Sequence, residues 1–168
     1  MPADVLSHLP DGVDIFLDAN IFIYAVSGLS PQCRNLLERC ARGDVVGITS
    51  LDTVNEVTHR LMVAEAFQKG LIAKPRADHL ARKPAVVRTL TDYWFQVESI
   101  LDIGLLLLQV EASTIWRAHT LRQRYGLLTL DSVLAGLLDE YGIEHLASHD
   151  ACFDQISTIR TYHPADVP

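Results

Sequence analysis

Short apolar runs alternate with helix-like segments along most of this chain, and this alternation restricts the possible fold more than any other feature. The runs are rich in β-branched and aromatic residues, which is typical of buried rather than surface strands. Strands are predicted over Val13–Leu17, Val45–Thr49, Leu105–Val110, Ile143–Ala147 and Ile156–Thr161. The pattern predicts an α/β fold with a mainly parallel central sheet flanked by helices, and ligands are expected at the carboxyl ends of the strands.

Helix start and stop signals stand between the first predicted strands. Ser30-Pro31 combines a capping residue with a proline at the first helical position, and Gly43 supplies a stop. Ser50 can cap the next helix, in which Val54, Val57 and Leu61 recur at helical spacing. A helix is therefore expected on each side of the second strand.

The second half of the chain predicts three more helices. The segment Gly70–Lys83 has the glycine and proline content of a loop. Pro84 then opens one long amphipathic helix that extends to Ile100. The last two helices are expected over Ala112–Tyr125 and, after a Thr129 cap, over Leu130–Glu140.

Length and composition favour one compact domain without a membrane segment. The chain has 168 residues, 49% of them hydrophobic, which suits a single core. Its first twelve residues lack the basic start and apolar run of a secretory signal. The longest apolar run, around Leu105–Leu108, is far shorter than the roughly 20 residues that cross a bilayer. We expect a cytoplasmic protein that has no membrane contact.

The three cysteines Cys33, Cys40 and Cys152 match no metal-binding or redox spacing. A disulfide framework is improbable with an odd number of cysteines, and we expect these thiols to pack inside the fold. Four histidines, His59, His119, His145 and His149, also lack zinc-site spacing and are interpreted as solvated or core residues. His149 is the exception because it directly precedes an acid of interest.

Basic residues gather in one part of an otherwise acidic chain. The net charge of −7 argues at first against a nucleic-acid partner, since phosphate binding usually leaves a basic footprint. However, seven of the 14 basic residues lie between positions 60 and 88, where Glu65 and Asp78 are the only acids. This basic segment is either a solvated surface or a patch that follows a nucleic-acid strand. Within it, Arg76, Arg82 and Lys83 are the candidate RNA-binding residues.

Four acids stand where this architecture brings strand ends together. They are Asp18 after the first strand, Glu56 on the helix after the second, Asp131 at the start of a helix, and Asp150 after a late strand. Each alone has an ordinary structural explanation: an Asx turn at Asp18, a surface pair between Glu56 and Arg60, a favourable helix dipole at Asp131, and a helix cap or turn at Asp150.

The four acids together indicate a metal site. Carboxylates that meet at one cleft repel each other strongly unless a cation neutralises them. Magnesium and manganese accept such oxygen ligands, and they support phosphodiester hydrolysis by activating water and stabilising the leaving oxygen. We therefore expect Mg²⁺ or Mn²⁺ as the cofactor.

The segments around these acids resemble the PIN domain, especially that of VapC-type toxins. They read FLDANIFIYA around Asp18, ITSLDTVNEV around Glu56, LLTLDSVLAGLL around Asp131 and LASHDACFDQI around Asp150. The resemblance covers nearly the whole chain. It implies a PIN-like three-layer sandwich over residues 1–168, in which the distance from Glu56 to Asp131 indicates a helical, basic insertion at about 65–104.

The resemblance also implies functional roles. The four acids would bind the metal and catalyse the cleavage of structured RNA, with Asn20 as a supporting polar residue beside the first acid and Asp154 as a second candidate support. The implied partners are RNA, a cognate antitoxin and a second copy of the chain in a homodimer. The insertion is predicted to guide RNA toward the acids by neutralising phosphates.

Other functions fit the residues less well. A phosphatase with Asp18 as nucleophile would need an acid two residues later, where Asn20 stands. The remaining alternatives are a nuclease of RNA maturation or decay without an antitoxin, and a non-catalytic RNA-binding scaffold. Trp94 and Trp116 could stack on bases, but their helical setting favours a packing role.

Overall fold

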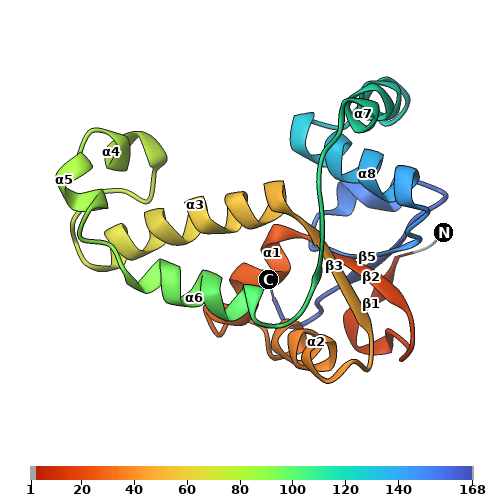
Figure 1. Ribbon diagram of the computed structural model, residues 1–168, viewed down its shortest axis with the longest axis horizontal. Coiled ribbons are helices and arrows are strands. Elements are labelled where there is room, and N and C mark those ends of the chain that lie inside the picture. Colours follow the sequence, from red (N-terminus) through yellow and green to blue (C-terminus); the bar gives the residue numbers. More distant parts are fainter. Residues whose placement is uncertain (1–2, 168) are drawn as a thin grey trace.

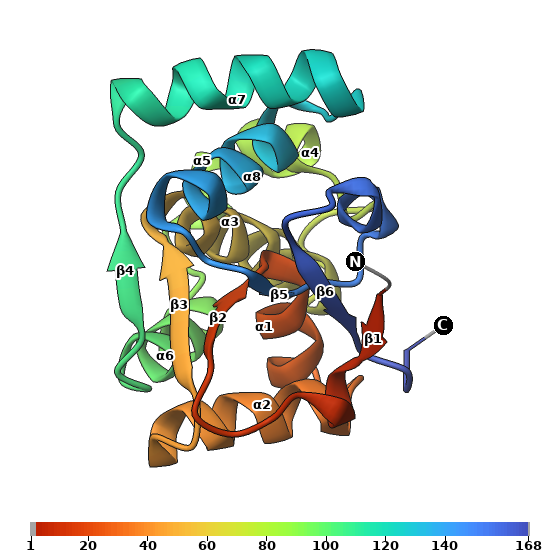
Figure 2. The same cartoon turned by 90° about the vertical axis from the view of Figure 1, so that its right-hand side faces the viewer.

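The computed structural model describes residues 3–167, which form a six-stranded, entirely parallel sheet covered by helices on both faces (Figure 1). The sheet has the order β1-β6-β5-β2-β3-β4, with β4 at one edge and β1 at the other (Figure 2). Its strands are β1 (Asp4–Val5), β2 (Asp14–Leu17), β3 (Val46–Ser50), β4 (Leu106–Leu108), β5 (His145–Ala147) and β6 (Arg160–His163). The predicted α/β class with a parallel central sheet is confirmed.

Eight α-helices and two short 3-10 helices surround the sheet within the described range. The α-helices are α1 (Ala19–Val26), α2 (Pro31–Arg42), α3 (Leu51–Gln68), α4 (Ala77–Ala81), α5 (Pro84–Val87), α6 (Asp92–Leu101), α7 (Ala112–Tyr125) and α8 (Thr129–Tyr141). The 3-10 helices are η1 (Leu6–His8) and η2 (Ala151–Gln155). No helix in residues 3–167 is long and apolar enough to cross a membrane.

The predicted caps account for several of these boundaries. The Ser30 hydroxyl accepts from the Cys33 amide at 3.0 Å and begins α2, while Gly43 ends it with a φ of +78°. The Ser50 hydroxyl accepts from the Thr53 amide at 3.0 Å and begins α3. The cap predicted at Thr129 is wrong, because Thr129 is already helical and Leu128 precedes α8 without a side-chain cap.

Central strand β2 feeds two hydrophobic cores because its side chains alternate between the faces of the sheet. Ile15 and Leu17 pack with residues of α1, α2, α3 and α6, whereas Phe16 packs with α8 and β5. All three side chains have no exposed surface. These two cores hold the strand ends in fixed positions.

A third core lies outside the sheet, between the end of α3 and the segment 70–91. Val63 and Ala66 of α3 contact Ile72, Leu80 and Leu90, all of them buried. Figure 1 shows α3 running away from the sheet, α4 and α5 at its far end, and α6 returning toward the sheet. The segment 70–91, hereafter the tip, thus has its own small core.

Several predicted boundaries in this half of the chain are wrong. The single helix expected from Pro84 to Ile100 is two helices, because the amides of Thr91 and Tyr93 bind the Glu65 carboxylate and start α6 anew. The expected loop Gly70–Lys83 contains α4.

Two further corrections concern the last strand and the first helix. The strand predicted over Ile156–Thr161 is β6 at Arg160–His163, since the apolar residues Ile156 and Ile159 are buried in the core without pairing in the sheet. Helix α1 was not predicted, because its sequence ANIFIYAV is apolar almost throughout and shows no helical spacing.

Candidate metal centre

Three parallel strands end at one edge of the sheet, and polar side chains follow each of them. Asp18 comes after β2, Ser50 ends β3, and Ser148 comes after β5. The main chain ties the first and third ends together, because the Asp18 amide donates to the Ala147 carbonyl at 3.0 Å. This edge, where ligands of parallel sheets usually bind, is the candidate site.

Asp18 is held in place by three hydrogen bonds. Its Oδ1 accepts from the Ala19 amide at 2.6 Å, which makes Asp18 the cap of α1. Its Oδ2 accepts from Asn20 Nδ2 and from the Ser148 hydroxyl, both at 2.7 Å. Asn20 Oδ1 in turn accepts from the His149 amide at 3.0 Å. Asn20 therefore connects the first acid to the loop that carries the fourth.

Ser148 is a residue that sequence reasoning missed. Its side chain is fully buried, and its oxygen accepts from the Asp150 amide at 3.0 Å while donating to Asp18. One hydroxyl thus positions both Asp18 and Asp150. Ser148 follows β5 directly, as Asp18 follows β2, but this position alone does not give the direction of its side chain.

Two of the predicted acids have raised pKa values. Burial is the main cause for Asp18, and the charges of Glu56 and Asp150 raise the pKa further, against the hydrogen bonds from Ser148 and Ala19. Burial also leads for Asp131, followed by the charges of Asp150 and Asp18. Asp18 and Asp131 therefore lie close enough to other predicted acids for those charges to oppose their ionisation, which a bound cation would relieve.

Glu56 and Asp131 face the same small cavity as Asp18. The cavity measures ≈ 40 Å³ and lies between the starts of α3 and α8, where Ser50, Asp52 and Thr53 also line it. Glu56 forms a 3.5 Å ion pair with Arg60, and both side chains are about one-third to one-half exposed. Such an exposed pair is weak, so Glu56 stays available to a ligand.

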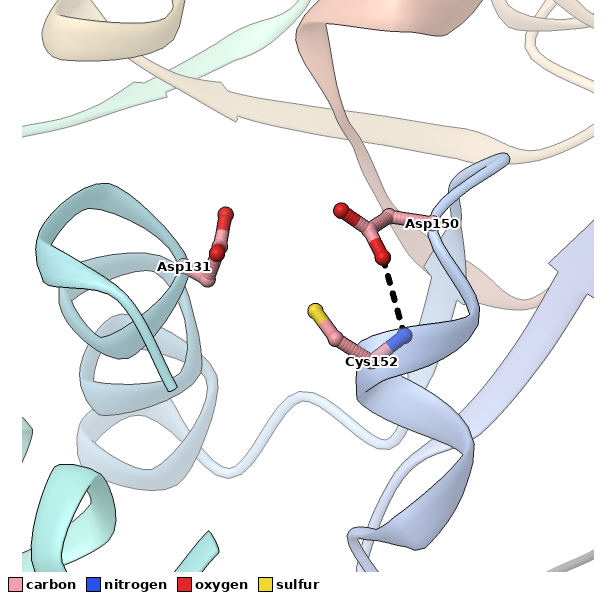
Figure 3. Close-up of side chains that lie close together, drawn as sticks. All are labelled: Asp131, Asp150 and Cys152. Atoms are coloured by element: carbon pink, nitrogen blue, oxygen red, sulfur yellow. Dashed lines mark hydrogen bonds between the residues drawn. The ribbon is translucent and has the colours of Figure 1, made fainter. Parts of the chain in front are cut away.

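Asp131, Asp150 and Cys152 form a second group of donors beside this cavity (Figure 3). One ligand atom of each lies within 4.8 Å of the other two. Asp150 Oδ1 accepts from the Cys152 amide at 2.9 Å, so Asp150 also caps η2. Burial, the hydrogen bond to Asp150 and the nearby carboxylates all raise the pKa of the Cys152 thiol.

The structure places the other predicted residues around this centre. Asp154 contacts His163 Nε2 at 2.9 Å, and His163 Nδ1 donates to the Ser148 carbonyl at 2.6 Å. His149 Nδ1 lies 3.1 Å from the Tyr24 hydroxyl. These three contacts fix the loop between β5 and η2. The position of Cys152 was missed, since its thiol lies beside two acids although packing alone was expected.

The basic residues lie apart from the acids. Arg76, Arg82 and Lys83 are exposed on the tip, beyond the far end of α3 (Figure 1). Arg76 pairs with Asp78 at 2.9 Å, and Lys83 donates to the Leu71 carbonyl at 2.8 Å. The 18 residues of α3 correspond to about 27 Å of helix. A single ligand could therefore contact both the tip and the acids only if it is long enough to span this distance.

The two tryptophans are outside the core of the chain, so the packing role predicted for them stays a prediction for an interface. Trp116 is 76% exposed and Trp94 is 47% exposed, with its Nε1 donating to Glu98 at 2.7 Å. Both lie on helices whose inner faces are filled by smaller residues, among them Ala118 on α7 and Val97 on α6.

Comparison with known proteins identifies the fold. No family model matches the chain, and no curated protein matches it. Among solved structures, it is similar to a chain of a toxin-antitoxin complex from Klebsiella pneumoniae, with 19% identity and a TM-score of 0.56 over 86% of this chain and 94% of that one.

Two further structures are similar to the same extent. VapBC2 from Rickettsia felis, bound to a DNA fragment from its promoter, gives 17% identity and a TM-score of 0.54 over 89% of this chain and 98% of that one. DNA-bound VapBC from Salmonella typhimurium gives 16% identity and a TM-score of 0.55 over 90% of this chain and 98% of that one. At such identities the likeness establishes the fold, and it confirms the PIN-like, VapC-type architecture predicted from the sequence.

Proposed function

We propose that this protein is a metal-dependent endoribonuclease and the toxin of a toxin-antitoxin pair. The observation that carries the proposal is the convergence of Asp18, Glu56, Asp131 and Asp150 at the carboxyl edge of a parallel sheet. Asp18 and Asp131 have pKa values raised by burial and by neighbouring acids, so the cluster favours a cation.

The donor set fits a hard divalent ion. The four proposed ligands offer only carboxylate oxygens, and magnesium and manganese both prefer oxygen donors. When bound, such an ion would supply the positive charge that activates water and stabilises charge on a phosphate. Ser148 and Asn20 would orient Asp18, because both donate to its Oδ2. Asp154 would support the same loop through His163.

The proposed toxin role rests on the fold and on an exposed apolar surface. Similar chains occur in complexes described as toxin-antitoxin and VapBC assemblies. Leu128 and Leu130 are 77% and 59% exposed at the start of α8, within three residues of Asp131. An antitoxin segment that covered these leucines would also block the acids. We further propose a homodimer, which light scattering of the purified chain would detect.

The proposed RNA path runs from the tip to the acids. Arg76, Arg82 and Lys83 would neutralise phosphates of an RNA whose other end lies at the carboxylates, roughly one length of α3 away. This path agrees with the insertion proposed at about 65–104, whose residues supply both the tip and its positive charge.

Cleavage of a pool of structured RNAs with Mg²⁺ or Mn²⁺ tests the nuclease. We expect Asp18→Asn and Asp131→Asn each to reduce cleavage by roughly 10²-fold or more, as does removal of a main electrostatic contributor in other enzymes. EDTA should have the same effect. Asp139→Asn is the matched control, since Asp139 lies on α8 but pairs with Arg117 instead of the cluster.

The outcomes separate the alternatives. Absence of cutting by the wild type, combined with retained RNA binding, would favour a non-catalytic scaffold. Cutting that no co-purified or genetically adjacent small protein inhibits would favour a nuclease of RNA maturation or decay. The results for Asp18→Asn and Asp131→Asn can be interpreted only if the control Asp139→Asn cuts RNA as well as the wild type does.

The RNA path is tested by replacing Arg76, Arg82 and Lys83 together with Ala. We expect weaker RNA binding and a salt dependence whose slope falls by up to about 2, because each lost phosphate contact removes roughly 0.7. Arg34 and Arg42, both exposed on α2, form the control pair. Unchanged binding and slope in the triple variant would remove the tip from the path.

A further inference from the structure

The third donor beside the acidic cluster is a thiol, and this changes which metal ions the centre can accept. Figure 3 shows the Cys152 sulfur pointing toward the space between the carboxylates of Asp131 and Asp150. One ligand atom from each residue lies within 4.8 Å of the others; Asp131 comes from α8, Cys152 from η2, and Asp150 from the position that caps η2. Small side-chain rotations would bring them around one ion.

Local hydrogen bonds order these donors, and one of them joins the Cys152 thiol to Asp150. Asp150 uses Oδ1 to accept from the Cys152 amide, which fixes the turn and keeps the sulfur on the side of Asp150 that faces Asp131. Asp150 is exposed, and Asp131 and Cys152 are half-buried, so an ion can reach the group from solvent. In contrast, the adjacent cavity of Asp18 and Glu56 is lined by oxygen donors alone among its polar residues.

We propose that Asp131, Asp150 and Cys152 form a site for a thiophilic divalent ion such as Zn²⁺, which overlaps the Mg²⁺ or Mn²⁺ site and would inhibit the nuclease by occupying it. Two oxygens and one sulfur suit zinc, whose sites with three protein ligands keep a fourth position for water. Thiolate ligands select against magnesium. The inhibitory consequence rests on the proposed function, whereas the binding site itself does not.

The chemistry of binding is consistent with the surroundings. The carboxylates near Cys152 disfavour a free thiolate, but the same negative charges attract a cation. On coordination the ion replaces the proton on Sγ, and that proton leaves to solvent. Cys152 also contacts the core formed by α8 and β5, so packing is the alternative explanation for a cysteine at this position.

Metal binding to the whole chain, without RNA, tests the site. The probes are Zn²⁺, Cd²⁺ and Mg²⁺ added to chelator-treated protein, read by calorimetry and, for Cd²⁺, by the ultraviolet thiolate-to-metal absorption. Cys152→Ser should weaken Zn²⁺ binding roughly ten-fold or more and abolish the Cd²⁺ band, while Mg²⁺ affinity changes less than about two-fold. Cys40→Ser is the matched control, because Cys40 is a half-buried cysteine that packs against the other core.

Equal Zn²⁺ affinity in wild type and Cys152→Ser, or a Cd²⁺ band that survives in Cys152→Ser, would overturn the site. Cleavage assays then separate the two proposals. If the wild type cuts RNA, Zn²⁺ added over excess Mg²⁺ should inhibit the wild-type protein more strongly than it inhibits the Cys152→Ser variant. Equal inhibition of the two proteins would overturn the proposal that zinc at this site inhibits cleavage. If the wild type cuts nothing yet binds Zn²⁺ through Cys152, only the nuclease proposal fails.

Discussion

Two carboxylates lie near opposite ends of helix α3, Glu65 in its last turn and Asp18 beside its first, and their pKa values move in opposite directions. At the far end, burial opposes the ionisation of Glu65, but bonds from Lys69, Tyr93 and Thr91 outweigh it and lower the pKa from 4.5 to about 2. At the sheet, burial and neighbouring acids raise the pKa of Asp18 despite its own hydrogen bonds.

The difference lies in what surrounds each charge. The Glu65 carboxylate accepts hydrogen bonds from the Lys69 ammonium at 2.6 Å and from the amides of Thr91 and Tyr93 at 3.0 and 2.9 Å. These donors balance its negative charge, and the two amides mark the start of α6. Asp18 shares its edge of the sheet with other acids. One region uses a carboxylate to hold the fold together, whereas the other brings several carboxylates together where we propose that a metal ion binds.

The largest expected effect is the loss of the Glu65 contacts. Glu65→Ala leaves two amides at the start of α6 without partners, and we expect the free energy of unfolding to fall by about 2 to 3 kcal/mol. Urea unfolding measures this. Asp92→Asn is the control, because it removes the other, exposed partner of Lys69 and should cost less than about 0.5 kcal/mol. Equal losses in both variants would contradict the role assigned to Glu65.

Acidification should separate the two regions by sign. Glu65 has a folded pKa of about 2 and an unfolded value of 4.5, so its stabilisation is complete above pH 4.5 and disappears as the pH falls toward 2. Asp18 and Asp131 have raised pKa values, so protonating them favours the folded state as the pH falls toward 3.8. Glu65→Gln should therefore lose less stability than wild type between pH 4.5 and 2. Parallel stability profiles for the two proteins would refute this.

The sequence predicted the parts of the fold that depend on short-range signals. Ser30, Gly43 and Ser50 set the ends of α2 and α3 through hydrogen bonds and backbone geometry within a few residues. The break before α6 could not be predicted, because Glu65 lies 26 positions before Thr91 and only the folded chain brings them together. The strand over Ile156–Thr161 was misplaced because burial alone produces an apolar run.

The candidate site divides in the same way. The four acids were identifiable because parallel strands place their carboxyl ends at one edge, so position along the chain predicts proximity. The roles of Ser148 and Cys152 depend on side-chain direction within one turn after β5, which spacing does not give. A buried hydroxyl between Asp18 and Asp150, and a thiol facing Asp131, become visible only with the coordinates.

The smallest expected effect on stability tests the cluster of acids at the edge of the sheet directly. Asp131→Asn removes one charge from the cluster, and it should raise the free energy of unfolding by up to about 1 kcal/mol in metal-free buffer, since Asp131 is half-buried and partly screened by solvent. Asp139→Asn on the same helix loses an exposed ion pair and should not stabilise.

Adding Mg²⁺ should make the wild type more stable than Asp131→Asn, which reverses their order in metal-free buffer. An ion that binds only the folded wild type stabilises it by about 1.4 kcal/mol at ten times its dissociation constant, and Asp131→Asn should gain less because it has lost a ligand. Thermal unfolding with and without Mg²⁺ measures both terms. If Asp131→Asn were less stable than wild type in EDTA, the acids at the sheet would be balanced as Glu65 is, and the contrast between the two ends of α3 would fail.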